Sequence, residues 1–144
     1  MPHFQIKSRF YASVLFEGEF GSLKLCVEAA VSAGANLAGA DLAGADLARA
    51  DLTRAYLAGA DLAGANVIDA GTPNGWRVVG WLQDGYLAIR VGCRNKRLGE
   101  AREYWNESHP FWSERQEIPP ALDYVESVAK LRGWALTAEQ KEAA

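Results

Sequence analysis

Four basic side chains lie within eight residues of each other and could bind a phosphate group. They are Arg90, Arg94, Lys96 and Arg97, and the Trp and Tyr residues of the same half could stack on nucleic-acid bases. Three glutamates follow between residues 100 and 107, and residues 71–144 carry ten basic and ten acidic side chains. We therefore expect a solvated basic turn, with a phosphate or nucleic-acid site as the alternative.

Cys93 adjoins Arg94, whose charge could lower the pKa of the thiol. A catalytic thiol also needs a base, and the nearest candidate, His109, belongs to a different loop. We expect Cys93 to be a small residue packed under a hairpin. The two Cys and two His of the chain lack metal-ligand spacing, and no glycine-rich phosphate loop is present. The sequence thus predicts no catalytic residue, cofactor or metal site, and a protein that is not an enzyme.

An Asp or Asn follows the first Ala in six of seven five-residue units between Ala35 and Asp69. The seven units read ANLAG, ADLAG, ADLAR, ADLTR, AYLAG, ADLAG and ANVID, with Leu or Val at every third position. Five residues advance an α-helix by about 500°, and an odd period alternates between the faces of a strand. Neither element would bury all seven apolar residues. Each unit is therefore predicted to be a short extended piece and a corner, with Ala and Leu inside and Asp or Asn outside.

These A-(D/N)-L-x-x units resemble the pentapeptide-repeat family. The resemblance implies a right-handed, four-sided β-solenoid of under two coils, whose narrow interior has no room for a ligand. Since four units make one coil, residues twenty apart should stack, such as Leu37 over Leu57 and Asp41 on Asp61. The fifth-position glycines are expected at the corners. Tyr56 and Val67 depart from the motif.

The segments on either side should cover the open ends of this short array, because exposed coil ends are unpaired strand edges. We expect a mainly β fold with α caps, in three segments: 1–34, a hairpin and helix; 35–70, the solenoid; and 71–144, a ββαα module. The elements are a hairpin over Phe4–Phe20, a helix from Ser22 to Gly34, strands Trp76–Leu82 and Tyr86–Cys93, helices Gly99–Glu107 and Pro119–Arg132, and a frayed tail over Thr137–Ala144.

The net charge and the distribution of apolar residues disfavour nucleic acid and membranes as partners. The net charge is −3, which gives no global field for nucleic acid or an anionic membrane, and no segment is apolar for long enough to span a bilayer. Two distant cysteines suit a reducing cytosol. The flanks, about residues 4–34 and 76–134, resemble those of bacteriophage and prophage pentapeptide proteins. We therefore expect a cytoplasmic protein of a bacterial host cell.

The outward carboxylates suggest an acidic mimic of DNA that inhibits a nucleic-acid enzyme, as other pentapeptide proteins do. Consecutive units face four different sides, however, and Arg49 and Arg54 dilute the charge. We instead expect an interaction or assembly protein that binds a host or phage protein, or a second copy of itself, through the solenoid wall and the Trp-rich cap. The candidate contact residues are Tyr56, Ile68, Arg90, Arg94, Lys96, Arg97 and Trp112.

Overall fold

The structure, a computed structural model, describes residues 1–137. The chain divides into two compact units, Met1–Asn66 and Val67–Ala144, which are described separately below. The expected three-segment organisation stays a prediction. The part of the expected tail that follows Thr137 lies outside the described residues.

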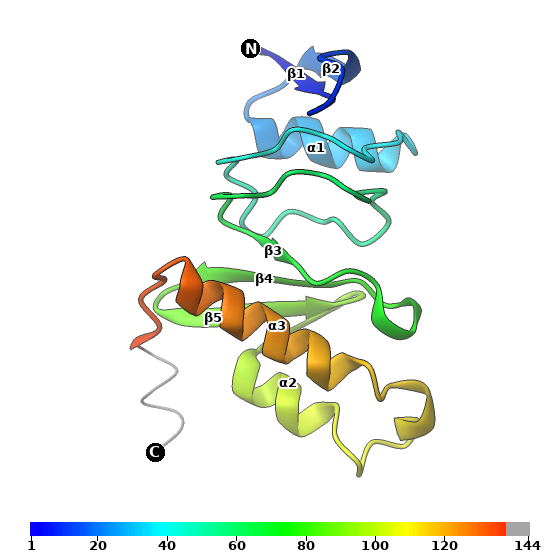
Figure 1. The fold of residues 1–144 in the computed structure, drawn as a ribbon, viewed down its shortest axis with the longest axis vertical. Coiled ribbons are helices and arrows are strands. Elements are labelled where there is room, and N and C mark those ends of the chain that lie inside the picture. The colour runs from blue at the N-terminus through cyan, green and yellow to red at the C-terminus, as the bar shows by residue number, and fades with distance from the viewer. Residues whose placement is uncertain (138–144) are drawn as a thin grey trace. The chain divides into compact units, whose positions relative to one another are not determined.

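The first unit begins with the predicted hairpin and helix (Figure 1). Strands β1 (His3–Lys7) and β2 (Val14–Glu19) pair antiparallel, with Phe4 opposite Gly18. Helix α1 (Leu23–Ser32) starts where the Ser22 side chain accepts a hydrogen bond from the Leu25 N–H, at 3.2 Å. This confirms the helix predicted from Ser22 to Gly34. Its buried side chains are Cys26, Val27 and Ala30.

A β-turn closes six of the five-residue units. The N–H of the Ala that begins the next unit donates to the carbonyl of the Leu three residues before it, at 2.9–3.1 Å. The first of these bonds joins Ala40 to Leu37, and the last joins Ala65 to Leu62. The fifth residue has a positive φ in Gly39, Gly44, Gly59 and Gly64, which is the geometry of a type II turn and favours glycine. The predicted corner glycines are confirmed.

The second-position Asp and Asn bind the backbone of their own turns. The Asn36, Asp41, Asp51 and Asp61 side chains each accept a hydrogen bond from the N–H two residues later, at 3.0–3.3 Å. Asn66 reaches across the repeat to hydrogen bond Asp46, and also accepts from the Leu47 N–H at 2.6 Å. These side-chain oxygens therefore stabilise turns by accepting hydrogen bonds from backbone N–H groups.

Residues twenty positions apart pair in parallel, as predicted. Isolated bridges join Asn36 to Tyr56 and Asp41 to Asp61. The Leu42 N–H donates to the Asp61 carbonyl at 2.9 Å, and the Asp61 N–H donates to the Ala40 carbonyl at 2.8 Å. Within the described residues these pairs do not extend into a closed sheet.

Most third-position side chains of the repeat point inward, as expected. Five of the third-position leucines are buried, from Leu37 to Leu57, but Leu62 is half-buried. The hairpin loop also pairs with the repeat, since the Arg9 N–H donates to the Gly39 carbonyl at 2.8 Å and the Asp41 N–H donates to the Lys7 carbonyl at 2.7 Å. Hairpin and repeat therefore belong to one packed unit.

The second unit is a four-stranded antiparallel sheet in the order β3-β4-β5-β6. The strands are β3 (Ile68–Asp69), β4 (Val78–Gln83), β5 (Tyr86–Val91) and β6 (Arg94–Arg97). The prediction of two strands was therefore incomplete, and Arg94–Arg97 is a strand, not a turn. Asp84 and Gly85 both have positive φ, as the two-residue hairpin predicted for this dipeptide requires.

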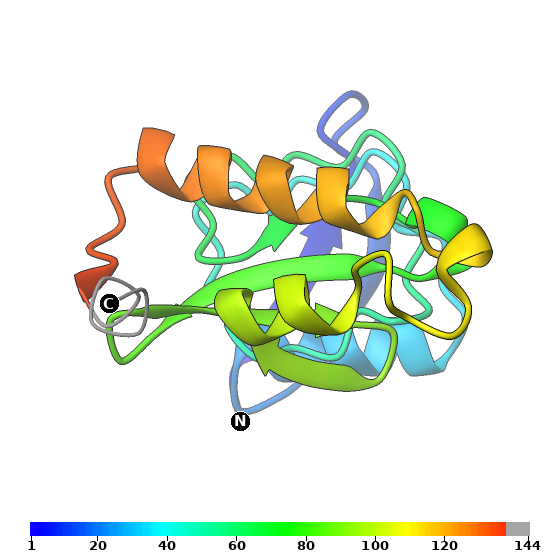
Figure 2. The same ribbon diagram turned by 90° about the horizontal axis from the view of Figure 1, so that it is seen from below.

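Helices α2 (Leu98–Tyr104) and α3 (Ile118–Leu131) lie side by side against one face of this sheet (Figure 2). Their buried residues pack with Ile68, Val78, Leu87, Ile89 and Val91. Contact is close at Gly80, where an added Cβ would lie 2.4 Å from the Val125 Cγ1. The segment from Leu98 to Trp105 places two aromatic side chains, Tyr104 and Trp105, at the end of α2.

Arg49 tests the turn geometry, because it adopts a φ of 66° where other units have glycine. Left-handed backbone strains a side-chain-bearing residue, so Arg49→Gly should raise the free energy of unfolding by about 1 kcal/mol. Arg54 occupies the same position of the next unit without a positive φ, and Arg54→Gly should lower that free energy by about 0.5–1 kcal/mol. Urea unfolding of both variants measures the difference. Equal effects would contradict this account of the turns.

Candidate functional site

The four cations predicted to form one basic cluster point to opposite faces of the sheet. Lys96 pairs with Ile89 and Arg94 with Val91, so both lie on the face that α2 and α3 cover. Arg97 pairs with Ala88, and Arg90 precedes the buried Val91, so these two lie on the other face. Side chains alternate along a strand, and this splits the cluster.

Each of these cations lies over an aromatic ring. Arg94 and Lys96 lie 5.2 and 4.5 Å from the centroid of Tyr104. On the opposite face, Arg90 lies 5.3 Å from the centroid of Trp81, and Arg97 lies 3.9 Å from that of Tyr86. Cation–π contacts hold the charges in place and leave the edges of a guanidinium able to donate hydrogen bonds.

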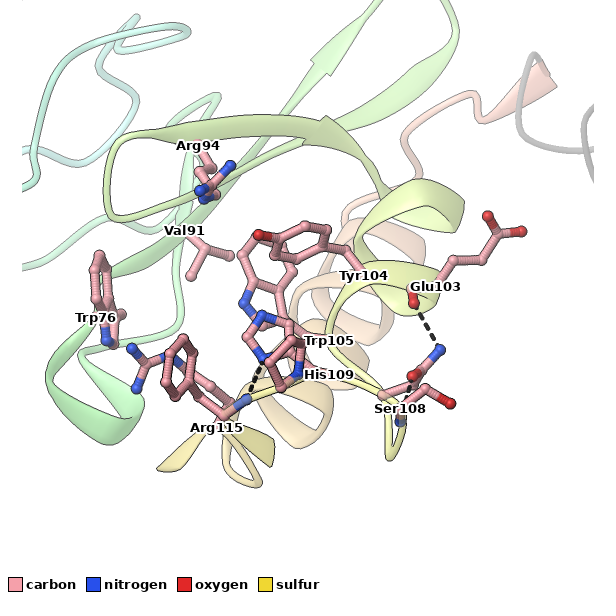
Figure 3. A pocket seen from close by; sticks show the side chains of 12 residues that line it. Trp76, Val91, Arg94, Glu103, Tyr104, Trp105, Ser108, His109 and Arg115 are labelled. Atoms are coloured by element: carbon pink, nitrogen blue, oxygen red, sulfur yellow. Dashed lines mark hydrogen bonds between the residues drawn. The ribbon is translucent and has the colours of Figure 1, made fainter. Parts of the chain in front are cut away.

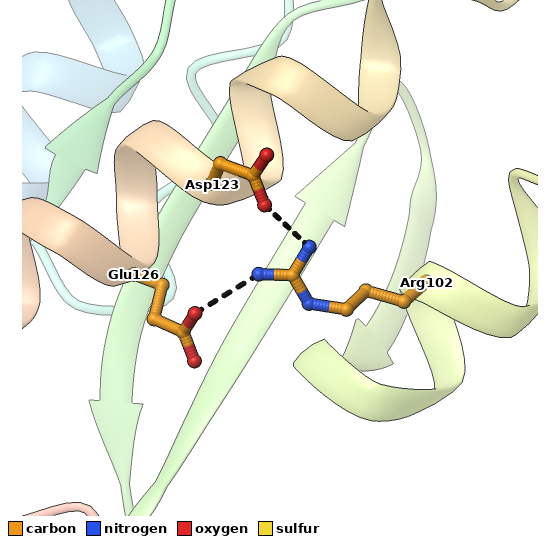
Figure 4. Close-up of polar contacts among 3 residues, drawn as sticks. All are labelled: Arg102, Asp123 and Glu126. Atoms are coloured by element: carbon orange, nitrogen blue, oxygen red, sulfur yellow. Dashed lines mark hydrogen bonds and ion pairs between the residues drawn. The ribbon is translucent and has the colours of Figure 1, made fainter.

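Two further arginines are held by carboxylates. Arg77 and Asp69 form a nearly buried ion pair at 2.6 Å. Arg102 of α2 donates to Asp123 at 2.6 Å and to Glu126 at 3.0 Å, both on α3 (Figure 4). This second contact is partly exposed and so contributes little to stability, but it fixes the position of α2 relative to α3.

The remaining predicted contact residues differ in accessibility. The Tyr56 side chain is 67% exposed, which suits a contact surface. Ile68 is 1% exposed, because β3 pairs with β4 and turns this side chain into the helix-covered core. The expectation that Ile68 is accessible to a partner was therefore wrong. Trp112 is half-buried in a short 3₁₀ turn over Trp112–Glu114.

Cys93 is exposed, not packed under the hairpin as expected. Val91 pairs with Arg94, so Gly92 and Cys93 form a two-residue loop that projects from the sheet. The other candidate of the thiol pair, His109, accepts a hydrogen bond through Nδ1 from the Phe111 N–H at 3.1 Å and packs edge-on against Tyr104. The contacts of the His109 ring are therefore with its own loop and with the end of α2.

A cleft of about 520 Å³ opens in the second unit (Figure 3). Its aromatic lining consists of Trp76, Tyr104, Trp105, His109 and Phe111, and its charged lining of Arg94, Glu103 and Arg115. A cleft of this volume is in the range that holds small organic ligands. We refer to it as the aromatic cleft.

Three separated parts of the chain line the aromatic cleft: Trp76, the β5–β6 hairpin with Val91 and Arg94, and the stretch from Glu103 to Arg115. Trp76 follows the 3₁₀ turn Pro73–Gly75 and lies over Gly92, where an added Cβ would be 2.3 Å from its ring. Helix α2 ends in Tyr104 and Trp105, whose ring centroids lie 4.8 Å apart. The loop after α2 then supplies Phe111 and Arg115.

Sequence reasoning identified one member of this lining, Arg94, as a candidate contact residue and missed Trp76, Phe111 and Arg115. These residues come from three separated segments, and no spacing pattern connects them. The concentration of all five Trp after residue 71 was the only available signal.

Within residues 1–137, no group of three His, Cys, Asp or Glu side chains is placed to hold a metal ion. No helix in that range combines the length and the apolar character that a membrane span requires. The predicted absence of a metal site and of a membrane partner stays a prediction.

Residues 33–70 match the family model for pentapeptide repeats, in eight copies. The sequence interpretation counted seven units over residues 35–69, one fewer. The match spans 38 of the 144 residues and does not reach the flanks. No curated protein and no solved structure matches the chain, so the resemblance of the flanks to phage proteins gains no support from these comparisons.

The contact between Trp76 and Gly92 predicts a strong effect of a single methyl group. Gly92→Ala would strain a residue with a φ of 59° and push Trp76 from its place, lowering the free energy of unfolding by about 2–3 kcal/mol. Gly99→Ala in α2 meets no atom within 4 Å, and should leave stability unchanged or raise it by about 0.5 kcal/mol. Thermal unfolding followed by Trp fluorescence compares the two. A Gly92→Ala protein as stable as the Gly99→Ala protein would refute the packing.

The two thiols should differ in reactivity. Cys93 is exposed and should react at once with a disulfide reagent such as DTNB. Cys26 is buried in α1, and burial raises the pKa of its thiol, so it should react only after unfolding. We expect one thiol to react quickly with DTNB in the native protein and two in denaturant. In the native Cys93→Ser variant no thiol should react quickly. Two fast thiols in the native protein would contradict the packing of α1.

Proposed function

Since residues 33–70 carry pentapeptide repeats, we propose that this segment forms a short right-handed, four-sided β-solenoid and acts as a rigid protein-binding scaffold. The type II turns and the pairing of residues twenty apart support this geometry, because four five-residue sides return the chain to the same face. The mainly β architecture with α-helical caps is part of the same proposal.

The observation that carries the binding role is the exposure of Tyr56. It stands at the second position of its unit, where other units have an Asp or Asn that stabilises the turn. Its ring instead lies 67% exposed on the outside of the repeat. Tyrosine is a frequent anchor residue of protein interfaces.

Two further exposed aromatic residues lie beside the same repeats. Phe10 and Tyr11 of the hairpin loop are 66% and 84% exposed, and Phe10 contacts Gly39. The neighbouring Arg9 donates to the Gly59 carbonyl at 3.2 Å, three residues after Tyr56. The Gly39 N–H in turn donates to the Ala58 carbonyl at 2.8 Å, so both turns are adjacent. We call Phe10, Tyr11 and Tyr56 the aromatic edge.

The walls beside the aromatic edge would let a partner backbone come close. Ala43, Gly44, Ala58, Gly59, Ala63 and Gly64 are all exposed and small. Small side chains create a flat surface, and the aromatic rings that project from it can then enter pockets of a partner. The partner is a host or phage protein, or a second copy of this chain.

We propose a non-enzymatic role, as is general for pentapeptide-repeat proteins. Mimicry of DNA is the weaker candidate, because the Asp41, Asp51 and Asp61 carboxylates already accept hydrogen bonds from their own turns. A phosphate site made jointly by Arg90, Arg94, Lys96 and Arg97 is weaker still, since these side chains divide between two faces of the sheet.

A phage or prophage origin and a place in the cytoplasm of the host cell belong to the same proposal. The neighbouring genes test the origin. Tail or head genes beside this one would favour an assembly part, and a cluster of small early genes would favour interference with a host protein.

A photo-crosslinking amino acid in place of Tyr56 tests the proposed surface. We expect it to trap a defined protein partner, or a second copy of the chain, in a cell extract of the source bacterium. The matched control carries the same amino acid in place of Tyr124, which is 53% exposed in the other unit. Light scattering of the purified protein measures self-association. A monomer whose position 56 traps no more than position 124 would refute the proposed surface.

A further inference from the structure

The aromatic cleft combines exposed rings with an excess of positive charge. Trp76 is 39% and Phe111 59% exposed, whereas Trp105, at 3%, is buried behind them. Folded proteins bury most of their large aromatic side chains, so two partly exposed rings in one cleft favour a planar ligand that packs against them. Stacking on aromatic side chains also tolerates many ring types.

The charges of the cleft favour an anion. Arg94 lies over Tyr104, and Arg115 lies 4.8 Å from the centroid of Trp76. Among the described residues, no carboxylate forms an ion pair with Arg94. Arg115 donates to the Glu114 carbonyl at 2.9 Å, and the Glu114 carboxylate is 4.0 Å away, at the limit of an ion pair.

The other charges near the cleft do not cancel this excess. Glu103 lines the cleft, but Figure 3 shows its carboxylate directed away from the rings and from both arginines. Lys96 adds a further positive charge above Tyr104. A guanidinium group that lies over an aromatic ring keeps N–H groups at its own edges, which can donate to phosphate oxygens.

From this arrangement we propose that the aromatic cleft binds a small molecule with a planar aromatic ring and a phosphate group, the chemistry of a nucleoside monophosphate. The ring stacks on Phe111 beside the partly exposed Trp76, and the phosphate is held by Arg94, with Arg115 over the Trp76 ring. The volume of about 520 Å³ accommodates a ligand of this size. The site is separate from the aromatic edge, so it goes beyond the protein-binding role.

The direct test is titration of the full chain with adenosine monophosphate, followed by calorimetry and by quenching of Trp fluorescence. Adenosine and inorganic phosphate are titrated in parallel. We expect each half-ligand to bind at least tenfold more weakly, a difference of about 1.4 kcal/mol, because each makes only one of the two contacts. A short single-stranded oligonucleotide without a terminal phosphate distinguishes a polymer from a mononucleotide.

Two substitutions in one strand supply the matched control. Arg94→Gln removes the proposed phosphate contact and should weaken binding at least tenfold. Arg97→Gln removes an equal charge from β6, but on the opposite face, over Tyr86, and should leave affinity within about twofold. Phe111→Leu keeps an apolar side chain without a stacking face and should weaken both the monophosphate and adenosine. Thermal unfolding of each variant verifies that it folds.

Each other outcome overturns the proposal. Equal losses in Arg94→Gln and Arg97→Gln would show attraction by overall charge alone. Equal affinity for adenosine and its monophosphate would show that the phosphate makes no contact with the protein. Binding of the oligonucleotide without binding of the monophosphate would show that the cleft binds a polymer. No binding of the monophosphate up to about 1 mM would exclude the site. None of these results bears on capture of a protein at position 56.

Discussion

An extended backbone directs successive side chains to opposite sides, and this constraint determines both units of the protein. In the repeat it turns Ala and Leu inward and leaves the intervening Asp or Asn outside, as Leu42 and Asp41 show. In the second unit it separates Arg94 and Lys96 from Arg90 and Arg97. The same rule thus builds the interior of one unit and prevents a single basic patch in the other.

The repeat also shows how polar side chains can serve the backbone. A run of five-residue turns exposes an amide at each corner, and the second-position side chain accepts from it in Asn36, Asp41, Asp51 and Asp61. Where Tyr56 replaces this residue, the unit gains an exposed ring in place of a turn-stabilising group. Loss of a turn-stabilising group in exchange for an exposed ring is expected at a contact surface. The aromatic edge therefore differs in role from the Asp and Asn residues that stabilise the turns.

The aromatic cleft depends on how close two backbones approach. Only a glycine at position 92 lets Trp76 lie over the β5–β6 loop, and only glycine at position 80 lets Val125 of α3 reach the sheet. Helix α2 is in turn held to α3 by Arg102, Asp123 and Glu126. The rings of Trp76, Tyr104 and Trp105 are therefore placed by the packing of the unit, while Arg94 and Arg115 bring positive charge to the cleft.

The sequence by itself determined several features with a short-range cause, although the β5–β6 hairpin was not among them. The five-residue period located the turns, Ser22 and Gly34 bounded α1, and Asp84-Gly85 marked a hairpin, because each depends on residues close along the chain. Tertiary structure alone decided what depends on distant segments. The pairing of β3 with β4 buried Ile68, the register of β5 with β6 divided the cations and exposed Cys93, and three separated segments met in the aromatic cleft. No local sequence pattern predicts these long-range contacts, because strand register and helix packing are fixed only when the hydrophobic core of the whole unit forms.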